Sequence, residues 1–273
     1  MPRINRRNVL IGLPLMALAS CLRIEYVDDF KLRELLREQE KIQQEHLLQD
    51  IKGILENKIY LFTQTIYTQK DFEAREYHNR SGHGTIYLTD KGKYVLTSDH
   101  IVSYYGENHH TPYGMLERRM EILDTITRTE GQQVLERIAT DEIKDFAVLK
   151  LPDDFEVPQY KVRLGDSSKL KELDKIYLLG DPHDLDYIIR EGIISNQLAV
   201  RDVDPRDKKW HEGINVSILV DLGDSGSPVI NQKGEIVGIL KESHFGISGY
   251  ISPIKWYIDA IRAYEAKHDK PQT

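Results

Sequence analysis

The chain has 273 residues, of which 40% are apolar and 30% charged, and its formal net charge at pH 7 is -7. The apolar fraction is enough for a full hydrophobic core, which excludes a disordered chain. The charge is modest and no basic cluster is interleaved with aromatic residues, so nucleic acid is not an expected partner. The single cysteine, Cys21, excludes an intramolecular disulfide, so core packing must hold the fold.

The first twenty residues have the composition of an export signal. Three arginines precede an apolar run over residues 9–18, which is too short to span a bilayer comfortably. The run ends in Leu18-Ala19-Ser20-Cys21, which resembles the lipobox of bacterial lipoproteins. This resemblance implies a signal peptide over residues 1–20, cleaved before Cys21, and a lipid such as palmitate on Cys21. A buried structural cysteine in a soluble protein is the alternative.

The resemblance to lipoproteins also implies a location in the bacterial cell envelope. Leu22 follows the cysteine, in place of the aspartate that retains many enterobacterial lipoproteins in the inner membrane. For a Gram-negative source, this favours the periplasmic face of the outer membrane over the inner membrane. The Arg6-Arg7 pair resembles a twin-arginine signal but lacks the usual preceding Ser or Thr, so the sequence leaves Sec and Tat export open.

Residues 28–58 are rich in Glu, Gln, Lys, Leu and Ile and contain no proline, which is a helical composition. Within residues 21–57 we therefore predict a lipidated N-terminus followed by a helical stalk or spacer. The apolar residues form two patches with only Ile42 between them, whereas a coiled coil requires a continuous stripe. Self-association through this helix and a single amphipathic helix packed on the next domain are both open.

From residue 58 the chain changes to short β-branched and aromatic runs separated by turn residues, which is typical of an all-β domain. We expect this domain to cover residues 58–273. Ser252 and Pro253 predict a capped helix that runs to about residue 266. The predicted strands lie near residues 59–66, 85–97, 116–125, 133–139, 146–151, 175–180, 187–194, 197–203, 215–221, 227–231 and 235–241.

Three side chains in this domain suggest nucleophilic chemistry. Ser225 lies between two glycines, which allow positive φ and leave space beside the hydroxyl for a carbonyl group. A serine nucleophile needs a base and an acid that orients the base. His100 follows a strand-like run and Asp145 opens another. Taken singly, a Gly-Asp-Ser-Gly turn and a lone histidine have ordinary structural explanations, so the combination carries the argument.

The order His100, Asp145, Ser225, each beside a strand, resembles the trypsin-like (chymotrypsin-fold) serine peptidases over roughly residues 81–261. Segments such as Gly192-Ile193-Ile194-Ser195 look most like bacterial HtrA-type proteases. The resemblance implies two six-stranded antiparallel β-barrels with a catalytic cleft between them and a C-terminal helix. The chain after Ser225 is too short for the peptide-binding PDZ domain of HtrA proteases, so we expect none.

The resemblance implies a mechanism for this chain. His100 would take the Ser225 proton, Asp145 would hold the imidazole, and a polypeptide substrate would be cleaved through an acyl-enzyme. The backbone N–H groups of Gly223 and Ser225 would form the oxyanion hole. No metal or cofactor is required. The adjacent pair His109-His110 has no carboxylate or cysteine at a spacing that supports a zinc site.

The sequence after Ser225 closely resembles the bacterial glutamyl endopeptidases, which bind the substrate carboxylate with a histidine and a threonine. Here Leu240 and Val220 stand at those two positions. A pocket formed by Leu219, Val220 and Leu240 would be apolar, so we expect cleavage after small or medium aliphatic residues. The substrate backbone is expected to pair with the strand edge at Lys241, Glu242 and Ser243.

The partner of Asp224 is not evident from the sequence, which leaves open whether the site is active. In animal trypsin-like enzymes this aspartate pairs with a newly released amino terminus, and no such partner is evident here. Asp224 must pair with a lysine or arginine, accept backbone N–H bonds, or leave the site disordered until it is activated. The alternative function is therefore a protease-fold protein that binds or senses peptides. An esterase reading of the block at Gly165-Asp166-Ser167-Ser168 fails, because neither the serine nor a late Asp-x-x-His has the required position.

Overall fold

The computed structural model describes residues 29–69, 75–103, 120–129, 133–182, 187–204, 209–244 and 248–269. The described residues fall into two units, one ending at residue 43 and the other beginning at residue 44. The predicted signal peptide and the lipidation site Cys21 lie outside the described residues. Within the described ranges, no helix is both long enough and apolar enough to cross a membrane.

Helix α1 spans Asp29–Glu56, close to the predicted range, and continues from the first unit into the second. Its last turns belong to the core of the second unit, where Ile51 and Ile54 are buried with residues of the C-terminal helix. Asp50 accepts hydrogen bonds from Tyr160 Oη and Arg163 Nη2, both at 2.7 Å. The end of α1 is therefore fixed by both apolar packing and polar contacts.

The first β-sheet follows α1 and has six strands in the order β4-β1-β2-β3-β6-β5. The predicted strand over residues 85–97 is two strands, because a turn at Thr89–Gly92 interrupts it. The sheet has six antiparallel strands, as expected, and forms a half-barrel. Among the described residues, a bridge between Arg128 and Val134, with backbone hydrogen bonds on either side of it, links β4 to the segment just before β5. The strands are β1 (Lys58–Gln69), β2 (Arg75–Leu88), β3 (Lys93–Thr97), β4 (Met120–Thr129), β5 (Glu136–Asp141) and β6 (Phe146–Lys150).

The second set of six antiparallel strands forms a closed barrel in the order β10-β11-β12-β9-β8-β7, as predicted for both halves. The two predicted strands over 187–194 and 197–203 are one long strand with register shifts. Valine, isoleucine and leucine side chains fill the barrel interior. The strands are β7 (Lys175–Gly180), β8 (Ile188–Asp204), β9 (Lys209–Ser217), β10 (Pro228–Asn231), β11 (Ile236–His244) and β12 (Ser248–Pro253).

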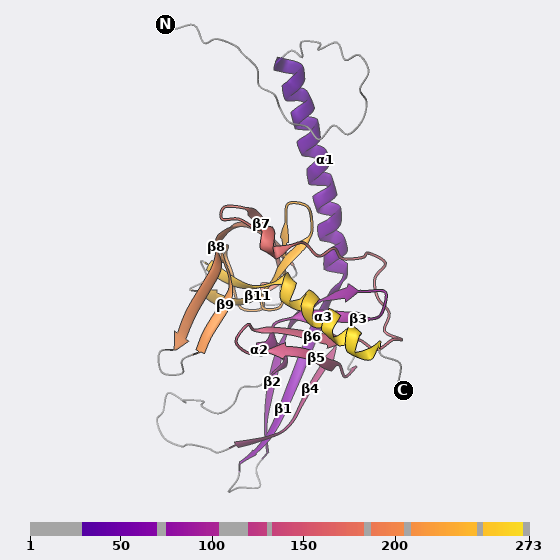
Figure 1. The fold of residues 1–273 in the computed structure, drawn as a ribbon, viewed down its shortest axis with the longest axis vertical. Helices are drawn as coiled ribbons and strands as arrows, with labels where there is room; N and C mark the ends of the chain where they lie inside the picture. The colour runs from indigo at the N-terminus through magenta and orange to yellow at the C-terminus, as the bar shows by residue number, and fades with distance from the viewer. Residues whose placement is uncertain are drawn as a thin grey trace. The chain divides into compact units, whose positions relative to one another are not determined.

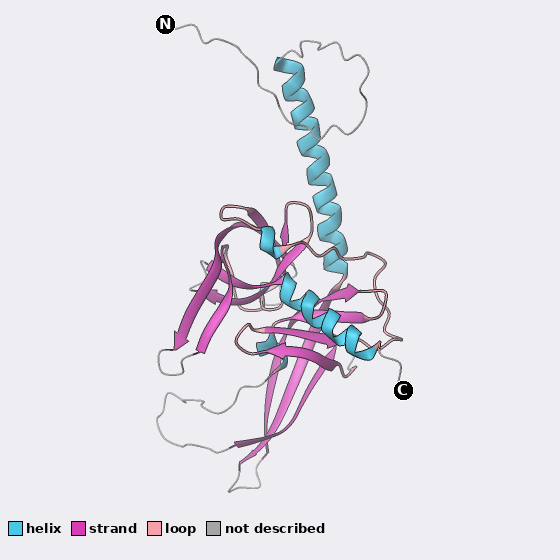
Figure 2. Cartoon of the chain, in the orientation of Figure 1, coloured by secondary structure: helices cyan, strands magenta, loops and turns pink. Residues whose placement is uncertain are grey.

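In the described part of the second unit, three helical segments follow the end of α1, and strands make up most of the remainder (Figure 2). The three segments are α2 (Asp99–Val102), the 3-10 turn η1 (Ser167–Lys169) and α3 (Ile254–His268). Strand β12 was not predicted: its residues 252 and 253 were assigned to a helix start, and α3 begins only at Ile254. Ser252 makes no capping hydrogen bond, so the predicted serine cap is wrong.

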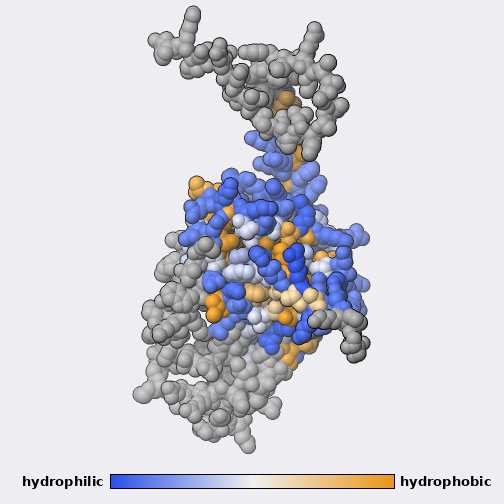
Figure 3. All heavy atoms as spheres, viewed as in Figure 1, coloured by the Kyte–Doolittle hydropathy of each residue, from blue (hydrophilic) through white to orange (hydrophobic). Residues whose placement is uncertain are grey.

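Helix α3 joins the two strand systems (Figure 1). Its buried side chains Ile254, Tyr257 and Ile261 pack in one core cluster with residues of β3, β6, β7 and β11. Tyr257 Oη also donates a hydrogen bond of 3.0 Å to the carbonyl of Thr97, three residues before His100. Hydrophilic side chains cover much of the viewed face of this unit, with apolar ones in small groups between them (Figure 3).

Candidate active site

Asp145 and His100 are in direct contact. Asp145 precedes β6 and is buried, and His100 lies in the short helix α2. The carboxylate accepts the backbone N–H of His100 at 2.8 Å and contacts Nδ1 with its two oxygens at 2.8 and 3.1 Å. This contact fits a proton on Nδ1, which leaves Nε2 as an acceptor. Burial alone would raise the pKa of Asp145, but hydrogen bonding and charge from His100 outweigh burial and lower it.

Asp145 has a φ of 50°, in the left-handed region that few residues other than glycine adopt. Ser252 of β12 supports this conformation from the other strand system. Its hydroxyl donates to the carbonyls of Lys144 at 2.8 Å and Asp145 at 3.1 Å. By binding these two carbonyls, Ser252 holds the backbone that carries the Asp145 side chain.

The turn around Ser225 has the predicted conformation, because Gly223 and Gly226 have φ values of 97° and 82°. Gly226 could carry no side chain, since a Cβ would overlap the carbonyl of His83. Most N–H groups of this turn already donate hydrogen bonds, namely those of Asp221, Leu222, Asp224, Gly226 and Ser227. Among the described residues, the N–H groups of Gly223 and Ser225 have no acceptor.

One carbonyl links the histidine segment to the serine turn. Leu240 O accepts Ser98 Oγ at 2.8 Å and Gly226 N at 2.9 Å. The N–H of His83 contacts the carbonyl of Ser225 at 3.4 Å. These contacts bring the two segments close together, although no hydrogen bond joins Ser225 Oγ to His100 within the described part of the chain.

The three predicted pocket residues lie in different environments. Leu219 is 66% exposed, whereas Val220 and Leu240 belong to the buried core of the closed barrel. The Val220 and Leu240 side chains both lie close to Gly249. A Cβ added at Gly249 would lie 2.9 Å from Val220 Cγ2 and 3.0 Å from Leu240 Cδ1. These two apolar side chains therefore pack closely against the backbone of Gly249, where a larger residue would not fit.

The predicted substrate edge follows Leu240 on β11. Glu242 and Ser243 pair with β12, and among the described strands β10 pairs with β11 only as far as Ile239. Lys241 lies at an irregularity in this pairing, and its side chain is buried with Nζ donating to the carbonyl of Glu212 at 2.5 Å. Burial lowers the pKa of Lys241. Its side chain points into the protein, so any contact with substrate would involve only its backbone.

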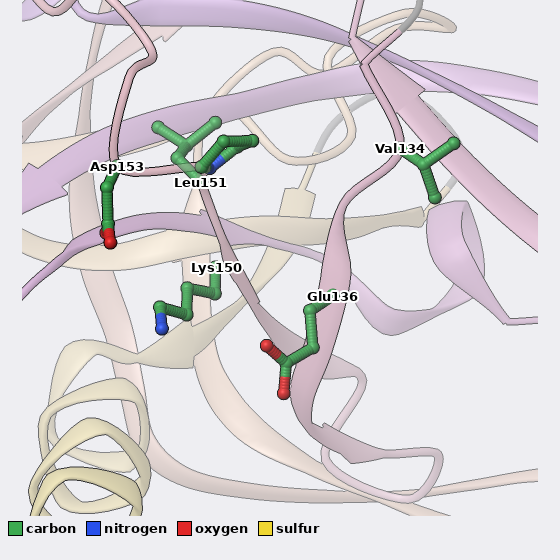
Figure 4. Close-up of a pocket in the computed structure, with 6 residues that line it drawn as sticks. Val134, Glu136, Lys150, Leu151 and Asp153 are labelled. Atoms are coloured by element: carbon green, nitrogen blue, oxygen red, sulfur yellow. The ribbon is translucent and has the colours of Figure 1, made fainter.

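Neither a metal-binding cluster nor the surface hollow beside β6 offers a second candidate site among the described residues. The described residues contain no cluster of three His, Cys, Asp or Glu side chains that could hold a metal ion. A small surface hollow is lined by Val134, Glu136, Lys150, Leu151, Pro152 and Asp153 (Figure 4). It lies at the opposite end of β6 from Asp145 and contains no candidate nucleophile.

Sequence reasoning missed two residues that support this arrangement. Ser252 was interpreted as a helix cap, and no local pattern distinguishes a capping serine from one that binds a distant turn. Ser98 lies two residues before His100, and its position in that segment was the available signal. Both are fully buried and both act across the two strand systems.

A closed six-stranded barrel beside an open six-stranded sheet, with a His–Asp pair and a glycine-flanked serine turn, defines the chymotrypsin-like class of fold. A family model described as "Trypsin-like peptidase domain" matches residues 82–239, more than half of the chain. The chain therefore belongs to the trypsin-like peptidase family.

Several similar proteins have DegP or HtrA in their names. A probable periplasmic serine endoprotease DegP-like of Pseudomonas putida is 32% identical over 156 residues, 57% of this chain and 28% of the relative. The serine protease Do-like HtrA of Bacillus subtilis is 30% identical over 166 residues, 58% of this chain and 32% of the relative. The chain thus spans about a third of the curated relatives it matches. A solved HtrA-type protease, AlgW with a decapeptide, has a TM-score of 0.58 at 17% identity, covering 82% of this chain and 68% of that one, and shows the fold alone.

Proposed function

We propose that this protein is a serine endopeptidase in which Ser225 is the nucleophile, His100 the general base and Asp145 the residue that orients the base. The observation that carries the proposal is the contact between buried Asp145 and His100 Nδ1. It supplies an oriented imidazole whose Nε2 is free to accept a proton. The shared carbonyl of Leu240 supports the proposal, because it ties the segment of this imidazole to the serine turn.

In the proposed mechanism, Ser225 Oγ forms a bond with the peptide carbonyl carbon while His100 Nε2 takes the hydroxyl proton. His100 then gives this proton to the leaving amine as the C–N bond breaks. Water hydrolyses the resulting acyl-enzyme with the same base. Asp145 remains ionised throughout and stabilises the imidazolium, which agrees with the lowered pKa of this carboxyl.

The negatively charged oxygen that develops during attack needs hydrogen-bond donors. The N–H groups of Gly223 and Ser225 are the candidates, since the neighbouring N–H groups of the turn are already engaged. One such donor contributes about 3 kcal/mol to the stability of the transition state. No metal ion or cofactor takes part in this mechanism.

For substrate preference we propose a small or medium aliphatic residue before the cleaved bond. Val220 and Leu240 are apolar and pack beside Gly249 in the core of the closed barrel. Neither side chain can bind a carboxylate, so glutamate is disfavoured there. The substrate backbone would pair along Lys241, Glu242 and Ser243, which follow the stretch of β11 that pairs with β10.

The location of this activity is also a proposal. The lipobox-like segment favours a protein anchored by a lipid on Cys21 in the cell envelope, with residues 28–58 as spacer or self-associating helix. The names of the relatives from Marinomonas and Pseudomonas include the word periplasmic, which agrees with an envelope location. The mass of the chain tests the anchor. An inhibitor of lipoprotein signal peptidase should leave the signal peptide attached, and Cys21→Ser should abolish the lipid adduct.

One observation favours the second candidate, a peptide-binding protein with an unproductive site: within the described residues, Ser225 Oγ and His100 make no hydrogen bond. Catalytic hydrogen bonds are, however, often long before substrate binds. Incubation of the full chain with an unfolded protein such as casein, with mass spectrometry of the products, separates the two. We expect cleavage after Val, Ala or Leu that is lost in Ser225→Ala. Rapid cleavage after Glu alone would contradict the proposed pocket, and binding without cleavage would favour the second candidate.

A further inference from the structure

Asp224, immediately before the proposed nucleophile, has a cationic partner inside the folded chain. The Asp224 side chain is fully buried, and Arg190 on β8 forms an ion pair with it through Nη2 and Oδ1. The Arg190 side chain is itself only 14% exposed. A buried carboxylate without such a partner would be strongly unfavourable, so this ion pair offsets the cost of burying the Asp224 side chain.

Arg190 holds more than one point of the serine turn. Its Nη1 donates to the carbonyl of Leu219 at 3.1 Å, while Nη2 binds the Asp224 carboxylate. The other carboxylate oxygen of Asp224 accepts the N–H of Asp221 at 2.7 Å. One guanidinium therefore braces both the start of the turn and the residue beside Ser225, and a planar fork with several donors is suited to this double contact.

The neighbouring strand leaves space for the pair. Gly180, the last residue of β7, lies against both side chains, and a Cβ at this position would overlap Asp224 Oδ1 and Arg190 Nη2. Three separate segments of the barrel thus contribute to one buried contact. In the described part of the chain, Arg190 is the sole cation paired with Asp224.

We infer that Arg190 is a positioning residue that acts through Asp224 to hold the Gly223 and Ser225 N–H groups in their orientation. The inference rests on the proposed function and concerns regulation of the same site. The cation that Asp224 needs comes from within the folded chain. A newly released amino terminus is consequently not required to order the site.

The test compares the full chain with Arg190→Met, Asp224→Asn and the double variant, using hydrolysis rates and fluorophosphonate labelling at Ser225. We expect Arg190→Met to lower kcat about 10²- to 10³-fold, the loss that follows removal of one oxyanion donor, while KM changes less than about fivefold. The double variant contains no unpaired buried charge, so it should recover to within about tenfold of the parent rate. Arg163→Met removes an Arg–Asp pair at a distance from the site and serves as the matched control.

The outcomes are distinct. If Arg190→Met folds and works at the parent rate, or the double variant is as slow as Arg190→Met, Arg190 does not act through Asp224 and the inference is wrong while the proposed function stands. If Arg190→Met does not fold, the double variant decides: a folded, active protein supports the inference, and a folded, slow one contradicts it. A parent chain that neither hydrolyses peptides nor reacts at Ser225 overturns the proposed function, and the inference with it.

Discussion

Ser252 of the closed barrel donates a hydrogen bond of 3.1 Å to the carbonyl of Asp145, the residue that contacts His100. The same hydroxyl binds the carbonyl of Lys144 at 2.8 Å. The orientation of the proposed acid thus depends on a residue from the other strand system, which ties assembly of the site to the packing of the two systems.

Ser252→Ala tests this dependence. Removal of the hydroxyl leaves two buried carbonyls without this donor, and we expect a loss of about 1 to 3 kcal/mol in the free energy of unfolding. Because Asp145 would be held less firmly, kcat should fall about tenfold with little change in KM. Denaturant unfolding and steady-state kinetics measure the two effects. An unchanged kcat in a destabilised protein would show that Ser252 supports the fold alone.

Asp145→Asn removes the charge with little change in shape. Asparagine tolerates positive φ, so the backbone at 50° should persist and the protein should fold. The amide favours the wrong tautomer of His100, and kcat should fall about 10⁴-fold. Circular dichroism checks the fold and peptide hydrolysis checks the rate. Less than a tenfold loss would remove Asp145 from the proposed mechanism.

Asp99, next to His100, gives a pH-dependent stability. Burial raises the pKa of Asp99 from 3.8 to about 6, and one of its oxygens has no partner among the described residues. Because the folded-state pKa is higher, this carboxyl adds stability below pH 3.8 that is lost as the pH rises through about 6. Asp99→Asn should therefore gain about 2 to 3 kcal/mol relative to the parent between pH 4 and pH 7.

Unfolding of the parent and of Asp99→Asn in urea at pH 4 and at pH 7 measures this change in relative stability. Titrating groups that the two proteins share contribute equally to both, so their contributions cancel. Asp90→Asn is the control, since Asp90 is exposed on the turn between β2 and β3. A difference between Asp99→Asn and the parent that is the same at both pH values would contradict the raised pKa.

The last turns of α1 should be necessary for the stability of the second unit. Ile54 is 1% exposed and packs with α3, whereas Leu48 on the same helix is 60% exposed. Ile54→Ala should lower the free energy of unfolding by about 2 to 5 kcal/mol, and Leu48→Ala by less than about 0.5 kcal/mol. Equal effects in thermal or urea unfolding would show that α1 is a spacer without a role in the core.

The sequence contained the local determinants of this site but not its long-range supports. The glycines around Ser225 predicted positive φ, and His100 and Asp145 could be located because each lies beside an apolar strand. The partner of Asp224 could not be chosen, because Arg190 lies 34 positions away and pairs with Asp224 only when β8 and the serine turn meet in the barrel.

For the fold as well, the sequence predicted local elements better than long-range pairing. Short β-branched and aromatic runs between turn residues indicated most strands, but β12 was missed because Ser252-Pro253 is also a good helix start. Whether a sheet closes depends on the pairing of its edges, which composition does not encode. The sequence therefore predicted two six-stranded sheets correctly but not that the first would be a half-barrel, with the bridge between Arg128 and Val134 near its edge strands β4 and β5.

The most direct test of the central claim is reaction of the full chain with a fluorophosphonate, with mass spectrometry to locate the adduct and Asp145→Asn alongside. The account predicts a single adduct on Ser225, whose rate of formation falls sharply in Asp145→Asn because the oriented base is lost. A folded parent chain that stays unmodified at Ser225, or that reacts equally fast in the variant, would contradict an assembled His100–Asp145–Ser225 site.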